Sequence, residues 1–122
     1  MNDTYVMTAH EMSGLMVAKS RELDEALSEY RSVTRGWVEA DRTMRIARAM
    51  AYLMADGKTV AEREAQVELS TDAETFSATL LDAKRNGAKE ALRARHSQLS
   101  ALQSTATALR EELKLVRTDN YS

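Results

Sequence analysis

A short segment in the middle of the chain, Gly57-Lys58-Thr59, has the residue types that end a phosphate-binding loop. A complete loop of that kind needs a glycine five residues before Gly57, where Tyr52 stands, and a strand in front of it. The same three residues also fit a helical turn followed by a cap. We therefore predict a turn here and not a nucleotide site.

The side chains that most often carry catalysis form no recognisable set. The chain has two histidines, His10 and His96, and no cysteine, which excludes thiol chemistry and removes the commonest zinc ligand. Its many acidic residues are typical of solvated helix faces. No nucleophile stands with a base and an orienting group in a pattern typical of a catalytic site. We predict a protein that is not an enzyme and that holds no metal or cofactor.

Basic side chains gather in two clusters that could contact phosphate groups. Residues 31–48 hold five arginines against two acidic residues, a net charge of +3. Residues 84–96 hold five basic residues against Glu90, a net charge of +4. The members of the two clusters are Arg31, Arg35, Arg42, Arg45 and Arg48, then Lys84, Arg85, Lys89, Arg93 and Arg95.

Charge pairing inside the chain is the alternative role for both clusters. Residues 56–82 hold seven acidic side chains against two basic ones, a net charge of −5, and would face residues 31–48 if the chain folded back near Gly57. The second cluster would then face the acidic residues between 22 and 29. Each exposed pair contributes only ~0.2–1 kcal/mol, but the pattern selects a register. Phosphate contact and internal pairing both stay open.

The composition predicts long helices that must position these clusters. There is no proline and there are four glycines, while aromatic residues make up 5% and charged residues 30% of the chain. Good helix formers dominate, and the material suits narrow apolar seams between helices better than a thick core. The formal net charge is −2, so overall charge does not indicate nucleic-acid binding.

The first helix is expected over residues 8–56. Thr8 and Glu11 match a capping box at its start, and Gly57 would end it in the left-handed conformation. Between them runs a series whose steps alternate four and three, which is typical of a coiled coil. The series comprises Lys19, Leu23, Ala26, Tyr30, Val33, Trp37, Ala40, Met44, Ala47, Ala51 and Met54.

The second helix is expected over residues 60–117, after a short turn at 57–59 that sends it back along the first. Thr59 and Glu62 match a second capping box. Thr71 and Glu74 match a third, so a break near residue 70 is an alternative, although the apolar stripe through it favours continuity. That stripe repeats every eleven residues and tightens to heptads, with Leu69, Leu80, Ala91, Leu102 and Leu113, then Leu92, Leu99, Leu102, Ala106, Leu109, Leu113 and Val116.

These elements predict an all-α fold: a long antiparallel helical hairpin, a coiled coil, that assembles into a homo-oligomer because two helices alone bury little surface. Residues 1–7 form an arm and residues 118–122 a tail. Trp37, beside Gly36, is either a bulky seam residue or an aromatic that stacks on a base. The expected seam comprises Leu23, Tyr30, Val33, Trp37, Met44, Leu99, Leu102, Leu109 and Leu113.

The chain from about Tyr30 to Leu113 resembles the bacteriophage recombination mediators of the UvsY type. The resemblance is carried by Arg45-Ile46-Ala47-Arg48, with Tyr52 close behind, where the family has Lys-Ala-Arg and a tyrosine pair implicated in DNA contact. Arg48 matches the arginine, and Ile46 stands where the family has lysine. Leu69-Ser70-Thr71-Asp72 is similar to a Leu-Ser-Ala-Asp segment that leads into the family's long C-terminal helix.

The resemblance implies a ring-like oligomer that binds single-stranded DNA and helps to load a RecA-like recombinase onto DNA covered by single-strand-binding protein. It places the chain in the cytoplasm, that of the host if a phage encodes it; no apolar run is long enough for a membrane span. The alternative is a structural or interaction protein, such as a phage scaffold, assembly chaperone or host-defence antagonist. The expected DNA contacts are Arg35, Arg42, Arg45, Arg48, Lys84, Arg85, Lys89, Arg93 and Arg95.

Overall fold

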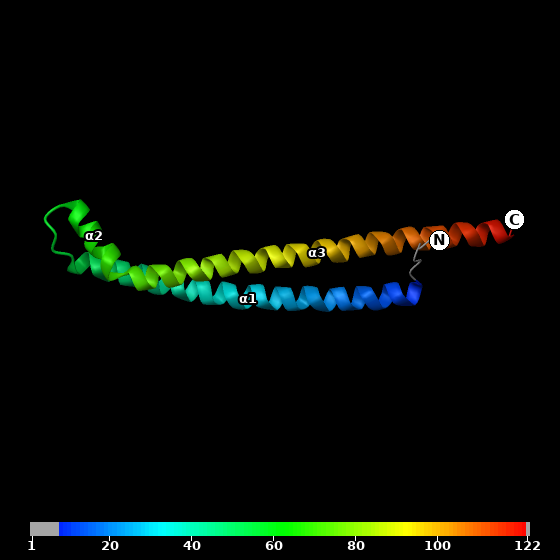
Figure 1. The fold of residues 1–122 in the computed structure, drawn as a ribbon, viewed down its shortest axis with the longest axis horizontal. Coiled ribbons are helices and arrows are strands. Elements are labelled where there is room, and N and C mark those ends of the chain that lie inside the picture. The colour runs from blue at the N-terminus through cyan, green and yellow to red at the C-terminus, as the bar shows by residue number, and fades with distance from the viewer. Residues whose placement is uncertain (1–7, 122) are drawn as a thin grey trace, which may run out of the picture. The chain divides into compact units, whose positions relative to one another are not determined.

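The structure is a computed structural model that describes the backbone of residues 8–121 and the side chains as far as residue 117. It contains three helices, α1 (Ala9–Met54), α2 (Val60–Ser70) and α3 (Asp72–Tyr121), and no strand among the described residues (Figure 1). The predicted all-α class is confirmed. The predicted arm at residues 1–7 lies outside the described residues.

The chain divides into two units. The terminal unit is Met1–Leu27 with Ala91–Ser122, and the central unit is Ser28–Glu90. In the terminal unit, Glu22 of α1 lies near Arg95 of α3, and residues near Met12 line a groove with Ala106. In the central unit, Trp37 lies under Arg85, and Ala51 lines a groove with Thr71. Within each unit the α1 and α3 segments therefore run in opposite directions.

The start of α1 is the predicted capping box. The backbone N–H of Glu11 donates to Thr8 Oγ1 at 3.1 Å, and the backbone N–H of Thr8 donates to Glu11 Oε2 at 3.1 Å. Two donors at the helix start are thus satisfied reciprocally, as the sequence pattern predicts.

The predicted seam of α1 faces its neighbours. Ten of the eleven residues in the series from Lys19 to Met54 are half-buried, and Met54 is 82% exposed because it ends the helix. Trp37 and Met44, both expected in the seam, are half-buried. A single neighbouring helix covers one side of a seam residue and leaves the other side open.

The turn after α1 differs from the expected one. The helix ends at Met54 and not at residue 56, and no described glycine has a positive φ, so the left-handed conformation predicted for Gly57 is wrong. Space is what requires glycine here. A Cβ at Gly57 would lie 2.8 Å from Glu62 Cβ and 3.0 Å from the backbone nitrogen of Arg63.

Two side chains of α2 hold the turn. Gln66 Oε1 accepts the backbone N–H groups of Asp56 and Gly57, each at 3.1 Å, while Gln66 Nε2 donates to Asp56 Oδ1 at 2.8 Å. Arg63 donates to the carbonyl oxygen of Gly57 at 3.1 Å. At the start of α2, Thr59 Oγ1 accepts the N–H of Glu62 at 3.1 Å, which is one half of the predicted capping box. Glu62 Oε2 accepts the backbone N–H of Lys58 at 2.8 Å in place of that of Thr59.

The favoured continuous helix over residues 60–117 is wrong, because α2 and α3 meet at Thr71. Its backbone has φ −115° and ψ 17°, and its hydroxyl donates to the carbonyl oxygen of Val67 at 2.6 Å. That hydroxyl therefore turns back into α2, and the third capping box does not form as predicted. Val67 and Thr71 are 0% and 2% exposed, so the bend is the best-buried point of the central unit. At its far end α3 continues to Tyr121, beyond the predicted end at residue 117.

The packing face of α3 is a heptad series, and the eleven-residue series fails as that face. Leu69 is 81%, Leu80 45% and Leu113 50% exposed. Leu113 was predicted to be a seam residue, and the structure leaves it exposed. The covered residues follow steps of three and four, apart from one step of seven between Leu92 and Leu99, and match the partner seam on α1. They are Ala78, Leu81, Arg85 and Ala88 in the central unit, and Leu92, Leu99, Leu102, Ala106 and Leu109 in the terminal unit.

Candidate nucleic-acid interface

Four arginines of α1 share one face of the central unit. Arg31, Arg35, Arg42 and Arg45, here called the arginine strip, are all exposed. At ~100° per residue they fall within an arc of roughly 80°. The same rotation places the seam residues on the other side of the helix. The strip therefore points away from α3.

The arginine strip makes no ion pair across helices among the described residues. Arg45 pairs with Asp41 of its own helix at 2.9 Å and keeps 75% of its side chain exposed. The internal pairing with the acidic segment 56–82, which the charge pattern allows, is thus not formed by this cluster. Four guanidinium groups remain directed at solvent, where they can donate to phosphate oxygens.

Arg48 stands apart from the strip. It is half-buried at the flank of the seam, although the resemblance to the mediator family singles it out. Tyr52, one turn beyond Arg48, is 45% exposed, and Ile46 is 49% exposed. An exposed tyrosine near exposed arginines is a combination that can stack on a base while the cations hold the backbone.

The second basic cluster is divided between the two units. In the central unit, Lys84 and Lys89 are exposed, whereas Arg85 belongs to the packing face. The guanidinium carbon of Arg85 lies 4.1 Å from the centroid of the Trp37 ring. Its Nη2 and Nε donate to Asp82 Oδ1 at 2.7 and 3.2 Å. Arg85, expected as a DNA contact, is thus held in the packing face of α3 by Asp82 and Trp37.

The environment of Arg85 favours its charged form. The hydrogen bond to Asp82 raises the pKa of Arg85 above its usual value, with a smaller contribution from Tyr30, while burial opposes the shift. The cation covers one face of the Trp37 ring. That face is not open to a base, so the seam interpretation of Trp37 describes the structure better than the stacking one. Arg85 occupies a heptad position between Leu81 and Ala88, which is the sequence signal for its place in the seam.

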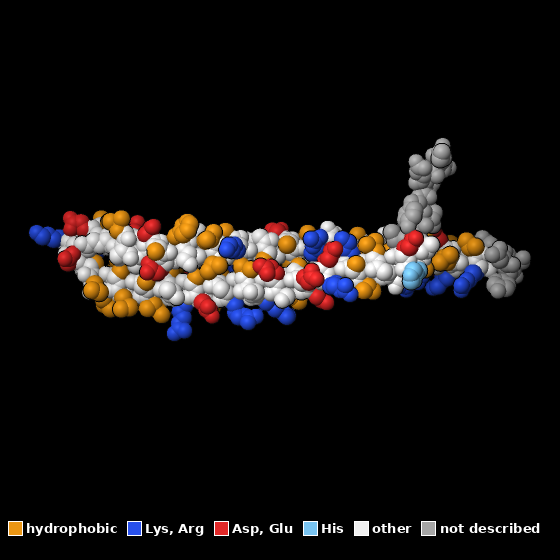
Figure 2. Space-filling model, turned by 60° about the horizontal axis from the view of Figure 1, so that its bottom comes forward, with side chains coloured by type: hydrophobic (Ala, Val, Ile, Leu, Met, Phe, Trp, Pro, Cys, Tyr) orange, Lys and Arg blue, Asp and Glu red, His pale blue; other side chains and the backbone are white. Residues whose placement is uncertain are grey.

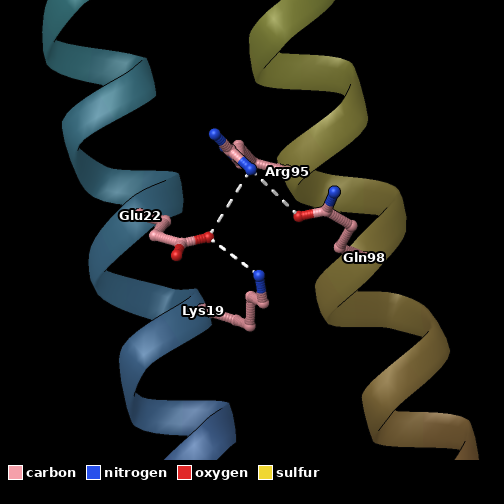
Figure 3. Close-up of polar contacts among 4 residues, drawn as sticks. All are labelled: Lys19, Glu22, Arg95 and Gln98. Atoms are coloured by element: carbon pink, nitrogen blue, oxygen red, sulfur yellow. Dashed lines mark hydrogen bonds and ion pairs between the residues drawn. The ribbon is translucent and has the colours of Figure 1, made fainter.

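In the terminal unit the predicted internal pairing does form. Arg95 Nη1 lies 3.7 Å from Glu22 Oε2 across the two helices and donates to Gln98 Oε1 at 3.3 Å. Lys19 Nζ reaches the same oxygen of Glu22 at 3.2 Å (Figure 3). Arg95 is exposed beyond this contact, and Arg93 is also exposed and engaged in a contact of its own. This part of the cluster acts as a bridge between helices.

Within the described part of the chain, no group of three histidine, cysteine or carboxylate side chains could hold a metal ion. None of the described helices is long and apolar enough to cross a membrane. A groove of about 620 Å³ lies in the terminal unit and is lined mainly by Met12, Met16, Val17, Leu109 and Leu113, with Arg21 and Arg110 among the polar residues.

Comparison of the chain with protein-family models, curated proteins and solved structures gave no significant match. The likeness to the UvsY-type mediators therefore stands on the residues that carry it. What the chain does must be argued from its own surfaces.

Proposed function

We propose that the chain is a non-enzymatic, self-assembling helical protein that binds single-stranded DNA. In this proposal it acts as a phage-type recombination mediator that helps a RecA-like recombinase load onto DNA covered by single-strand-binding protein. The observation that supports the proposal is the arginine strip. Its four guanidinium groups lie opposite the seam and make no ion pair across helices among the described residues.

The strip has the length and chemistry for a flexible polyanion. From Arg31 to Arg45 the helix rises about 21 Å at ~1.5 Å per residue, enough to follow several phosphates of an extended strand. Each phosphate that an arginine neutralises releases counterions, which favours binding at low salt. Tyr52 continues the same side of α1 and supplies an exposed ring. Such contacts hold the backbone with little dependence on base sequence.

Self-assembly is supported by the surface that one copy leaves uncovered. The chain exposes 9547 Å², whereas a compact chain of 13.6 kDa exposes about 6,600 Å². Among the described residues only four apolar side chains are buried: Met12, Val67, Ala78 and Ala106. Hydrophobic side chains also spread over the face that Figure 2 presents. We propose that the α1 and α3 segments form an antiparallel coiled coil that is completed by other copies.

The test is a titration with a fluorescently labelled single-stranded oligonucleotide at several salt concentrations. Replacing Arg35, Arg42 and Arg45 by alanine should weaken binding and flatten the plot of log affinity against log salt by about 2, at ~0.7 per lost contact. The matched control removes three charges elsewhere, with Arg21, Lys58 and Arg110 replaced by alanine. An equal loss of oligonucleotide affinity in both variants would show that the effect comes from the change in net charge and not from the arginine strip. Absence of binding by the natural chain at low salt would contradict the proposal.

A structural or interaction protein is the second candidate, and one observation favours it. Met50, Leu53 and Met54 at the end of α1 are 58%, 88% and 82% exposed. Clustered exposed apolar side chains mark surfaces that another protein covers. If oligonucleotides fail to bind while the chain assembles, this candidate takes the place of the mediator.

A further inference from the structure

The start of α3 carries a second apolar stripe that no part of the described chain covers. It begins with Leu69 at the end of α2 and continues with Ala73, Phe76, Leu80, Ala83 and Gly87, in steps of four and three. All six residues are exposed; Phe76 is 67% and Leu80 45% exposed. We call this set the second stripe.

The second stripe lies opposite the packing face of α3. Phe76 and Leu80 each stand two residues from Ala78, a rotation of about 200° at 3.6 residues per turn. Ala78 is 4% exposed against α1. The helix thus has two heptad seams on opposite sides, and a helix of that kind packs between two neighbours. The chain supplies one neighbour, α1, and leaves the other place open.

We propose that a second copy of the chain fills this place, with its α3 antiparallel to the first and a two-fold axis near Leu80. The proposal rests on the self-assembly part of the proposed function and not on DNA binding. Its basis is the size order along the second stripe. Around Leu80, Phe76 of one copy meets Ala83 of the other, and Ala73 meets Gly87. A parallel pair would set Phe76 against Phe76 and leave a gap where Gly87 meets Gly87.

The edges of the second stripe agree with this pairing. One edge carries Asp72 and Asn86, and the other carries Ser77 and Lys84, all four of them exposed. In the antiparallel pair Asp72 faces Asn86 and Lys84 faces Ser77, so no like charges meet.

Single cysteines test the pairing cleanly, because the chain contains none of its own. Under mild oxidation, Leu80→Cys should give a disulfide-linked dimer. Ala73→Cys alone should not, since its two copies would lie about 21 Å apart along the helices, beyond the ~7 Å limit between Cα atoms. Ala73→Cys mixed with Gly87→Cys should cross-link to each other. Self-linking of Ala73→Cys, or no cross-link at Leu80→Cys, overturns the proposal.

A non-covalent test separates this interface from DNA binding. Light scattering on Phe76→Lys/Leu80→Lys should show at least a twofold fall in mass, with the helical circular dichroism retained because both side chains are exposed. Val38→Lys/Ile46→Lys, on α1, is the control and should keep its mass, since both side chains are exposed and lie outside the second stripe. The arginine-strip variant should lose oligonucleotide binding and keep its mass. An unchanged mass for Phe76→Lys/Leu80→Lys would overturn the proposed interface and leave the DNA-binding proposal unaffected. Failure of the natural chain to bind DNA would overturn the DNA-binding proposal and leave the interface proposal unaffected.

Discussion

The two units pack the same pair of helices with different material. In the terminal unit the face of α3 toward α1 holds leucines, including Leu92, Leu99 and Leu102. In the central unit that face holds Ala78, Leu81, Arg85 and Ala88, while large apolar residues such as Phe76 point outward. The inner seam of the central unit is thus rich in alanine and carries the charge of Arg85, and large apolar side chains lie on the outer face of α3. The inner seam of the terminal unit is thus rich in leucine, whereas the central unit leaves large apolar residues such as Phe76 outside its seam.

The largest expected effect lies at the bend of the central unit. Val67→Asp places a charge at a site that is 0% exposed, and it should cost about 4 kcal/mol or more. The matched control is Val60→Asp, which is 62% exposed and at the start of α2, where an acid suits the helix dipole. Urea unfolding followed by circular dichroism measures both. Similar stabilities of the two variants would show that Thr71 and Val67 are not the centre of this unit.

Trp37→Ala should come next in size. The ring is half-buried, so its loss should cost about 2 kcal/mol, below the ~3–5 kcal/mol of a fully buried tryptophan. It also removes the ring from under Arg85. Calorimetric melting is the measurement, with Trp37→Phe as the variant that keeps a ring and most of the stability. An unchanged melting temperature for Trp37→Ala would contradict the packing of the central seam.

The glycines of the central unit should respond in opposite directions. Gly57→Ala would force its Cβ against Glu62 and the backbone of Arg63, a cost of about 1–3 kcal/mol. At Gly36 the nearest atom to a new Cβ is Leu81 Cδ2 at 4.0 Å, so Gly36→Ala should stabilise by about 0.5–1 kcal/mol through helix propensity. Thermal melts of both variants decide the sign. Destabilisation by Gly36→Ala would indicate a closer helix approach than the structure has.

The smallest effect is expected in the terminal unit, at its bridge between helices. Glu22 and Arg95 keep 39% and 43% of their side chains exposed, so a double-mutant cycle with Glu22→Gln and Arg95→Gln should give ~0.2–1 kcal/mol. The coupling should shrink as salt is added. A coupling of several kcal/mol, or one that ignores salt, would show that the terminal unit depends on charge more than on its leucines.

The sequence predicted the elements that local chemistry decides. The caps at Thr8 and Thr59 need only a hydroxyl three residues before an acceptor side chain, and the α1 seam follows from its own periodicity. The break at Thr71 was harder, because an apolar stripe crosses it and the deciding bond goes back to Val67. The eleven-residue stripe led to a wrong prediction of the packing face, because Leu69 and Leu80 lie on the side that faces away from α1. The packing face of α3 was hard to recognise in the sequence because it contains the charged residue Arg85. A guanidinium group rarely lies in a seam unless an aromatic ring and a carboxylate contact it.

The candidate site was predicted only in part. The positions of the basic residues are visible in the sequence, but their surroundings depend on which side of each helix meets its neighbour. That choice leaves Arg42 in solvent, covers Arg85 and directs Arg95 to Glu22. Net charge over a segment cannot separate these three outcomes, because residues three or four positions apart share a face and residues two apart do not.

The stacking of Arg85 on Trp37 gives the protein an optical reporter of its own. The chain has one tryptophan, so all indole emission comes from the central seam. Opening of that seam would expose the ring to water and shift its emission to longer wavelength. A ligand on the arginine strip, on the far side of α1, would leave the emission in place. Ordinary fluorescence can thus follow, without a label, whether the two helices stay together while the outer faces are occupied.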